Sequence, residues 1–345
     1  MNLAEKIKKV ASDNFEKIVE IRRHIHQNPE LSFQEFNTSA YIQKELTRLG
    51  IDFKAGYVKT GIVGLIKGKN PESKIIALRA DMDALPILEE NTVDYKSVNE
   101  GVMHACGHDV HSASLLGVAT ILNQLRNEFE GTVKLIFQPG EEKLPGGASL
   151  MIKEKALENP KPTAIFGQHV FPDLPCGTVG FRPGMYMAST DELYLTVKGK
   201  GGHAALPHKC IDTVLIACEI ISSLQQVVSR MAKPDVPSVL SFGKINSTEG
   251  ATNIIPDEVK IEGTFRTMNE EWRTEAHKKM VSLAQGIATS MGGSCEFEVK
   301  RGYPFLKNDE ATTELAKNGA IEFLGKDKVI DLDLRMTAED FSYYT

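Results

Sequence analysis

Three short segments gather the side-chain types that bind divalent metals in proteins. The first runs from His104 to His111 and reads His-Ala-Cys-Gly-His-Asp-Val-His; the others are Gln138–Glu142 and Gly167–His169. Together they offer thiolate, imidazole and carboxylate ligands. Glu141 is a further carboxylate beside a candidate ligand. The set therefore predicts a metal centre with its own general base, which is the chemistry of hydrolysis.

Cys106 and His108 are separated by one glycine. Gly107 allows the backbone to bend so that both side chains face one point. Taken alone, this pattern is more typical of a buried cysteine beside a helix start. Three histidines within eight residues are hard to explain by packing, however, and they favour the metal site. We interpret His104 and His111 as residues that support the ligands and do not bind metal themselves.

The adjacent carboxylates Glu141 and Glu142 allow a division of roles, because one can bind metal while the other accepts a proton from water. Most Glu-Glu pairs lie on solvated turns, but this pair follows an apolar strand, where loops carry catalytic groups. Asp81 and Asp83 also follow a strand. They belong either to a solvated loop or to a pair that orients the metal ligands, and we favour the second.

A cysteine nucleophile is the competing interpretation of the same residues. Cys106 activated by a histidine would form a covalent intermediate. That chemistry leaves Glu141, Glu142 and His169 without a role, although a histidine at a strand end is, alone, more often structural. We therefore prefer the metal-dependent hydrolase.

Strands and helices alternate in the part of the chain that carries these residues. The apolar spacing predicts strands at 62–66, 74–80, 133–137 and 164–169, and helices at 3–26, 37–49, 109–126 and 150–155. Asp109 is the predicted N-cap of the third helix. This order indicates an α/β fold with a doubly wound, mostly parallel sheet. The candidate ligands then meet at the carboxyl edge of the sheet, where such folds place their sites.

The pattern changes near residue 184. Strands and helices are predicted in the order β-α-β-β-α-β, at 192–197, 211–231, 238–242, 259–266, 270–291 and 295–300. This order, with half-polar strands, predicts an α+β open-faced sandwich on an antiparallel sheet. We expect residues 184–300 to be an inserted domain, and residues 1–183 with 301–345 to form the catalytic domain.

Bulk composition narrows the classes of partner. A chain of 345 residues exceeds one comfortable core, so two domains are expected. The net charge of −6 and pI near 5.9 argue against a nucleic-acid partner. No apolar run approaches the ~20 residues of a membrane span. Five scattered cysteines and a charged amphipathic N-terminus predict a cytoplasmic protein with reduced thiols.

A series of ordered motifs runs from about Arg22 to the last residue. The motifs are Arg22–His26 with Pro29–Leu31, Arg79–Pro86, His104–His108, Gln138–Glu142, Gly201–Ala205 with Pro207 and His208, Thr252–Pro256, Gly263–Arg266, and Glu339–Tyr344. In these segments the chain resembles the hippurate hydrolase, N-acyl-L-amino-acid amidohydrolase and indole-acetyl-amino-acid hydrolase family of di-metal, aminoacylase-like metallopeptidases. The number and order of the motifs exclude a chance match.

The resemblance implies a hydrolase that cleaves the amide of an N-acyl amino acid, with two divalent ions per subunit, zinc, manganese or a similar metal. It assigns metal binding to Cys106, His108, Glu142 and His169, with Glu141 as the general base. The inserted sandwich becomes a lid that also forms a homodimer.

The resemblance also assigns roles within the insert. It implies that His203 reaches the neighbouring subunit's site and polarises the scissile carbonyl, while Asn253 and Arg266 hold the substrate carboxylate or the oxyanion. Without the resemblance, Asn253 is a turn residue before Pro256, and Arg266 is a surface ion-pair partner.

The family pattern continues beyond the point where this sequence stops. Members of the family carry a last histidine ligand after the Glu-Asp-Phe-Ser segment, whereas no histidine follows His277 here. We therefore expect the catalytic domain of these 345 residues to be truncated and one metal to lack a ligand. The alternative function is a catalytically impaired relic of the same fold that binds a metal or a ligand.

Overall fold

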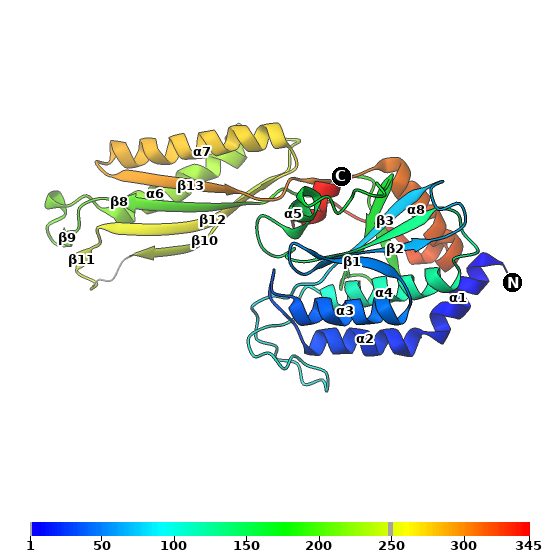
Figure 1. The fold of residues 1–345 in the computed structure, drawn as a ribbon. Helices are drawn as coiled ribbons and strands as arrows, with labels where there is room; N and C mark the ends of the chain where they lie inside the picture. The colour runs from blue at the N-terminus through cyan, green and yellow to red at the C-terminus, as the bar shows by residue number, and fades with distance from the viewer. Residues whose placement is uncertain (1, 248–250) are drawn as a thin grey trace. The chain divides into compact units, whose positions relative to one another are not determined.

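The computed structural model describes residues 2–247 and 251–345, which divide into two compact units. Unit 1 runs to Phe181 and resumes over residues 311–331 and 344; unit 2 comprises 182–310, 332–343 and 345. Figure 1 shows the helices and strands of both units. Residues 332–343, which the sequence analysis assigns to the catalytic domain, cluster with unit 2.

A five-stranded sheet in the order β1-β2-β4-β3-β5 forms the centre of unit 1. β3 runs parallel to its neighbours β4 and β5, and β2 is antiparallel to both β1 and β4. Only β2 opposes the common direction, so the mostly parallel sheet is confirmed. The strands are β1 (Asp52–Tyr57), β2 (Gly61–Lys67), β3 (Ile75–Asp81), β4 (Thr132–Gln138) and β5 (Ala164–Gly167).

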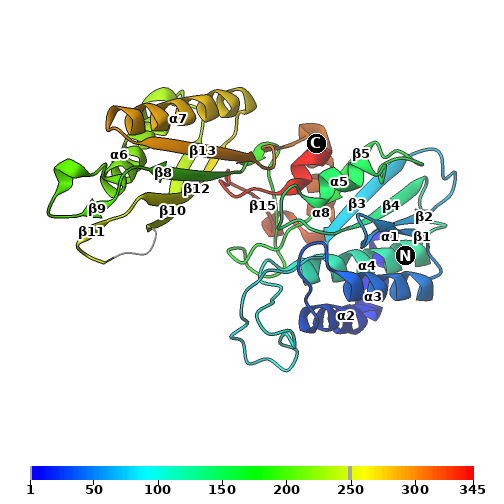
Figure 2. The ribbon, with the colours of Figure 1, turned by 60° about the vertical axis from the view of Figure 1, so that its left-hand side comes forward.

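Helices cover both faces of this sheet, as a doubly wound fold requires (Figures 1 and 2). α2, α3 and α4 share one apolar core with β4, while α5 packs on the opposite face through Met151 and Ile136. Unit 1 contains α1 (Leu3–Asp13), α2 (Phe15–Gln27), α3 (Phe36–Arg48), α4 (His108–Gln124), α5 (Gly147–Lys153) and nearly all of α8 (Glu310–Leu324).

The single helix expected over residues 3–26 is two helices, α1 and α2, which meet at Asn14. The Asn14 side chain donates a hydrogen bond from Nδ2 to the Val10 carbonyl (2.8 Å). Asparagine competes in this way with the helical hydrogen bonds of its own turn, which the apolar spacing alone does not reveal.

Unit 2 is an open-faced sandwich. Its four-stranded sheet has the order β10-β12-β8-β13 with every neighbouring pair antiparallel, and its helices lie on the same face (Figure 2). The observed order confirms the predicted β-α-β-β-α-β arrangement. The elements are β8 (Asp191–Lys198), α6 (Thr213–Gln226), the π-helical turn η2 (Val227–Met231), β10 (Ser238–Ser247), β12 (Glu258–Thr267), α7 (Glu270–Ser290) and β13 (Ser294–Arg301).

Short strand pairs complete the two units. β6 (Val179–Phe181) pairs in parallel with β15 (Val329–Asp331) in unit 1. Within unit 2, β7 (Gly184–Met187) pairs with β14 (Leu306–Asn308), and β9 (Gly202–His203) with β11 (Ile254–Ile255), both antiparallel.

The segment Thr213–Met231 is the one described helix that is long and apolar enough to cross a membrane, judged by length and composition. Ile216, Ile220 and Leu224 on this segment are buried against the sandwich sheet. We therefore interpret it as the core helix of unit 2.

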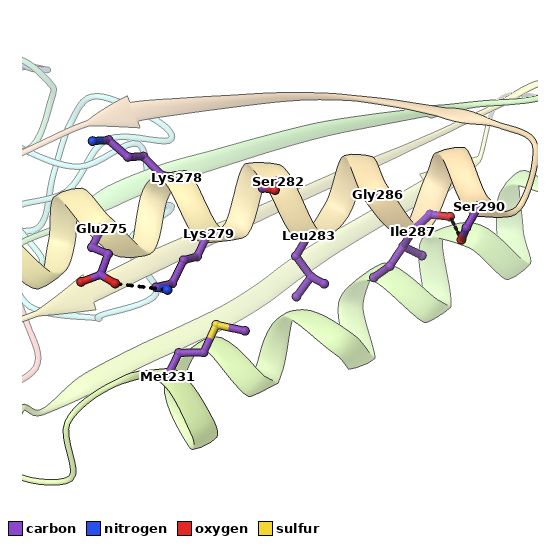
Figure 3. Close-up of a pocket in the computed structure, with 9 residues that line it drawn as sticks. All are labelled: Met231, Glu275, Lys278, Lys279, Ser282, Leu283, Gly286, Ile287 and Ser290. Carbon is purple, nitrogen blue, oxygen red and sulfur yellow. Dashed lines mark hydrogen bonds and ion pairs between the residues drawn. The ribbon is translucent and has the colours of Figure 1, made fainter.

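A groove of about 700 Å³ lies between η2 and α7 on the helical side of unit 2 (Figure 3). Glu275 and Lys279 form an ion pair of 3.1 Å on one wall. The groove is lined by Met231, Glu275, Lys278, Lys279, Ser282, Leu283, Gly286, Ile287 and Ser290. None of the predicted site residues is among them.

In chain order, β8 is the first strand of the sandwich sheet and β13 the last. The two ends lie side by side, because Asp191 at the start of β8 pairs in register with Arg301 at the end of β13. A buried ion pair between Arg273 and Asp191 lies there, with Nη2 and Oδ1 2.6 Å apart. Arg273 also donates to the carbonyl oxygens of Thr190 (2.9 Å) and Gly302 (3.0 Å). One guanidinium thus joins the segment that enters the sheet to the segment that leaves it.

Candidate metal centre

Cys106 and His169 lie together although 63 residues separate them, with Cys106 Sγ and His169 Nε2 3.3 Å apart. Cys106 precedes α4, and His169 follows β5 by two residues. The Val170 carbonyl lies 2.7 Å from His169 Nδ1 and can only accept, so Nδ1 carries the proton. His169 Nε2 therefore carries no proton and faces the thiol.

Gly107 is required by two separate features of this turn. Its φ of +91° is one that side-chain-bearing residues rarely adopt. A Cβ at this position would lie 2.4 Å from Cγ2 of Val170, so a larger residue would displace the Val170 side chain, which directly follows His169 in the chain. Gly107 thus lets α4 begin at His108 directly beside the His169 segment.

His108 is held by two aspartates, one at the end of β3 and one two residues beyond it. Its Nδ1 lies 3.2 Å from Asp83 Oδ1, and its Nε2 lies 3.7 Å from Asp81 Oδ2. Asp83 also accepts hydrogen bonds from Ser32 Oγ (2.6 Å) and from the backbone N–H of Glu142 (2.9 Å). Asp83 therefore fixes the positions of two predicted ligands at once, and it turns His108 Nε2 toward the site.

The turn that carries Glu141 is held in place by Glu35, which no sequence motif indicated. Glu35 is fully buried, and it accepts hydrogen bonds from the backbone N–H of Gly140 and from Thr60 Oγ1, both at 2.8 Å. Burial raises the pKa of the Glu35 carboxyl, against the effect of these hydrogen bonds. Gly140 adopts a φ of +62°, and a Cβ there would lie 2.3 Å from the Phe33 ring.

The donor atoms around His108 fit a divalent ion. His108 Nε2 and Glu142 Oε1 are 3.8 Å apart, and both are buried without a hydrogen-bond partner among the described residues. Two ligands bound at about 2 Å to one ion lie at most about 4 Å apart, so this pair is compatible with a shared ion. Two sets of possible ligand atoms lie within 4.8 Å of one another. One set comes from Cys106, His108 and His169, and the other from His108, Glu141 and Glu142.

Protons compete with a metal for these donors. Burial raises the pKa of the Cys106 thiol and the pKa of the Glu142 carboxyl. Burial acts to lower the pKa of His108, but the carboxylates of Asp81 and Asp83 outweigh it and raise that pKa well above 6.5. Metal binding at Cys106 and His108 must therefore displace protons, which makes the affinity depend on pH.

Asp109 does not cap α4 as predicted. The N-cap residue is Gly107, and Asp109 lies in the first helical turn. Its Oδ2 instead binds His26 Nδ1 (2.8 Å) and Arg22 Nε (2.7 Å), and these partners draw the carboxylate away from the helix end. His26 Nε2 in turn lies 3.1 Å from Oε1 of Glu89, a residue in the loop between β3 and α4. The Arg22–His26 motif was the available signal for this network.

The two histidines predicted to support the ligands have different surroundings. His111 lies 2.6 Å from Asp81 Oδ1 through Nδ1, and its Nε2 accepts a hydrogen bond from the Val170 N–H (2.9 Å). His104 is buried with no hydrogen-bond partner for either ring nitrogen among the described residues. Burial lowers the pKa of His104 to about 4, so its ring is neutral at pH 7.

The three predicted functional residues of the insert do not meet within one chain. His203 and Asn253 are exposed on neighbouring segments, which are joined by a hydrogen bond from the Ala204 N–H to the Asn253 carbonyl (2.9 Å). Both lie near the start of β12, at Glu258. Arg266 is eight residues further along this strand, roughly 26 Å at ~3.3 Å per residue. Burial lowers the pKa of Arg266.

Residues 77–345 match the peptidase family M20/M25/M40. An N-acetyl-L-cysteine deacetylase of Bacillus subtilis is 41% identical over 100% of this chain and 81% of its own length. An N-acyl-L-amino acid amidohydrolase of Geobacillus stearothermophilus is 39% identical over 91% of this chain and 84% of its own.

A solved structure extends the likeness to the fold. The YXEP protein of Bacillus subtilis, described as a dinuclear metal-binding peptidase of the M20 family, is 36% identical with a TM-score of 0.79 over 98% of this chain and 86% of its own. These matches confirm the resemblance found in the sequence motifs. The chain therefore belongs to peptidase family M20/M25/M40, and it is a hydrolase that acts on amide bonds.

Proposed function

We propose that the chain hydrolyses the amide bond of N-acyl amino acids and that it uses two divalent ions, zinc, manganese or a similar metal. The proposal rests mainly on the buried carboxylate of Glu141. One of its oxygens lies within 4.8 Å of a possible metal-binding atom of His108 and of another of Glu142. The names of the deacetylase and amidohydrolase relatives support N-acyl amino acids as the substrate class.

The chain's own residues would divide the work as follows. The metal ligands in this proposal are Cys106, His108, Glu142 and His169. When bound, the ions would polarise the substrate carbonyl and activate water. Glu141 takes a proton from the attacking water and passes it to the leaving amine. Asp81 and Asp83 keep His108 oriented through their hydrogen bond and close contact with its ring.

The insert, residues 184–300, serves in this proposal as a lid and as the homodimer interface. Asn253 and Arg266 hold the substrate carboxylate or the oxyanion, and His203 polarises the carbonyl at the partner's site. The separation along β12 supports a role for two copies, because His203 and Arg266 of one chain lie at opposite ends of that strand. A symmetric pair of chains can bring one end of each insert to a shared site.

The alternative is a relic that keeps the fold and binds a ligand without turnover. We favour the enzyme because relatives named for hydrolytic reactions match nearly the whole chain, and because the donors of Cys106, His108 and His169 are assembled in one group. We further propose that the enzyme works in the cytoplasm on small N-acyl amino acids.

A panel of N-acetyl- and N-benzoyl-amino acids tests this function. The protein is stripped with a chelator, reloaded with Zn²⁺ or Mn²⁺, and compared with Cys106→Ala for metal content and release of free amino acid. We expect hydrolysis that disappears on chelation and returns with metal, and a lower metal content in Cys106→Ala. Metal-loaded protein that hydrolyses no member of the panel would leave the relic as the better account.

A further inference from the structure

His111 bridges two parts of the metal centre that come from different elements. It lies on α4, three residues after His108, and it is almost completely buried. Its ring contacts the Asp81 carboxylate on one side and the Val170 backbone on the other. Asp81 ends β3, whereas Val170 follows β5 and is the neighbour of His169.

The hydrogen bonds of His111 define its tautomer. The Val170 N–H can only donate, so His111 Nε2 must accept and carries no proton. The proton therefore resides on Nδ1 and is donated to Asp81 Oδ1 at 2.6 Å. Both ring nitrogens of His111 are thus engaged, Nδ1 as a donor and Nε2 as an acceptor. This state suits a residue whose ring lies 4.6 Å, centroid to centroid, from the ring of His169.

Asp81 gives His111 a rigid anchor. Its other oxygen, Oδ2, binds Arg79 Nη1 at 2.5 Å, and Arg79 Nε donates to Gln138 Oε1 at 2.9 Å. Ser112 Oγ also donates to the Asp81 backbone carbonyl at 2.7 Å. Arg79, Asp81 and Gln138 belong to the central strands β3 and β4 and are buried. The position of His111 is therefore set by the middle of the sheet.

His169 needs such support because it lies outside regular structure. It follows the edge strand β5 and is exposed, whereas His108 is buried in the first turn of α4. Its ring packs nearly edge-on against His111, with an interplanar angle of 70°. The bond from Val170 to His111 fixes the peptide group that directly follows His169.

We infer that His111 is a positioning residue that holds His169 Nε2 in place for metal binding, by accepting the hydrogen bond from the Val170 N–H. The inference rests on the proposed role of His169 as a ligand. In this inference the hydrogen bond accepted by His111 Nε2 holds the His169 segment, and the bond from Nδ1 to Asp81 keeps the proton on Nδ1. Partners of this kind typically contribute 10–100-fold to metal affinity.

Two substitutions separate the two contacts of His111. His111→Gln retains an acceptor oxygen at the distance of Nε2, and His111→Asn retains only a donor near the position of Nδ1. His277→Gln is the matched control, because it replaces the histidine of another histidine–carboxylate hydrogen bond (2.6 Å from Nε2 to Asp191) in unit 2, away from the metal centre. Zn²⁺ affinity is measured by competition with a chromophoric chelator, and thermal unfolding is recorded for each variant.

We expect His111→Asn to lower Zn²⁺ affinity by about 10–100-fold and His111→Gln to lower it less, with His277→Gln at the wild-type value. In a His169→Ala background, His111→Asn should lower the Zn²⁺ affinity only slightly further, because the residue through which His111 acts is already absent.

Equal affinities in His111→Asn and wild type, or additive losses in the double variant, would overturn the inference and leave the proposed function standing. If the wild-type protein binds neither Zn²⁺ nor Mn²⁺, the proposed function and the inference both fail. A drop in melting temperature much larger than that of His277→Gln, with unchanged affinity at low temperature, would show a purely structural role.

Discussion

Glu141 and Glu142 are neighbours in the chain with different surroundings. The backbone N–H of Glu142 donates to Asp83, and Glu142 Oε1 lies 3.8 Å from His108 Nε2, among the candidate ligand atoms. The Glu141 side chain is the more deeply buried of the two. Two adjacent carboxylates thus differ in what they can do, as a ligand and a proton acceptor should.

The two glutamates should therefore respond differently to the same substitution. Glu141→Gln removes only the proton acceptor, so we expect metal content close to wild type and turnover lower by roughly 10²–10⁴-fold. Glu142→Gln should lose metal first. Metal analysis of each purified variant, with kcat on one N-acyl amino acid, distinguishes them. The opposite pattern would mean that the roles are exchanged.

At this scale, residue types and their positions after strands were enough to predict the candidate ligands. Cys106, His108 and His169 come together because strand ends meet at one edge of the sheet. The supports could not be predicted in the same way. Glu35 binds the Gly140 N–H across 105 residues, and no local pattern marks such a contact. Likewise, the tautomer of His111 depends on a backbone N–H brought in by folding.

At the scale of elements, periodicity predicted most of the sheet and the whole order of the sandwich. It missed β1, whose side chains alternate between exposed and half-buried and which contains Gly56. An edge strand with so little buried surface gives only a weak apolar signal. Helix ends were misjudged where polar side chains decide them, at Asn14 and at Asp109.

The Asp191–Arg273 ion pair should make unit 2 sensitive to acid. Burial acts to raise the pKa of Asp191, but His277 and Arg273 outweigh it and lower that pKa. A carboxyl with a lowered pKa stabilises the fold above its unfolded value of about 3.9, and this stabilisation is lost as the pH falls through the folded value.

We expect Asp191→Asn to lower the stability of unit 2 at pH 7 by about 3 kcal/mol, because Arg273 is left buried without its partner. The difference from wild type should shrink as the pH falls below about 4. Trp272 is the only tryptophan in the sequence and lies in unit 2, so its fluorescence during urea unfolding reports on this unit. A difference that stays constant from pH 7 to pH 3 would contradict the assignment.

At the scale of the whole molecule, the distribution of residues along β12 favours catalysis by two chains. If His203 acts at the partner's site, chains with His203→Ala and chains with Glu141→Gln should each be inactive alone. A heterodimer of the two should recover one working site, which combines the intact Glu141 of one chain with the intact His203 of the other. Heterodimers isolated with two affinity tags and assayed for turnover provide the test. No recovery would place His203 in its own chain's site or outside catalysis.

The adjacency of Asp191 and Arg301 has an evolutionary consequence. The sandwich begins and ends at neighbouring backbone positions, and Arg273 joins the segments that flank them. A segment with such closely spaced ends can be gained, lost or exchanged with little disturbance of the fold that carries it. If the insert holds the substrate and pairs the subunits as proposed, changes confined to this one segment alter both properties while the sheet of unit 1 stays unchanged. Relatives of this chain are named for several different amide substrates.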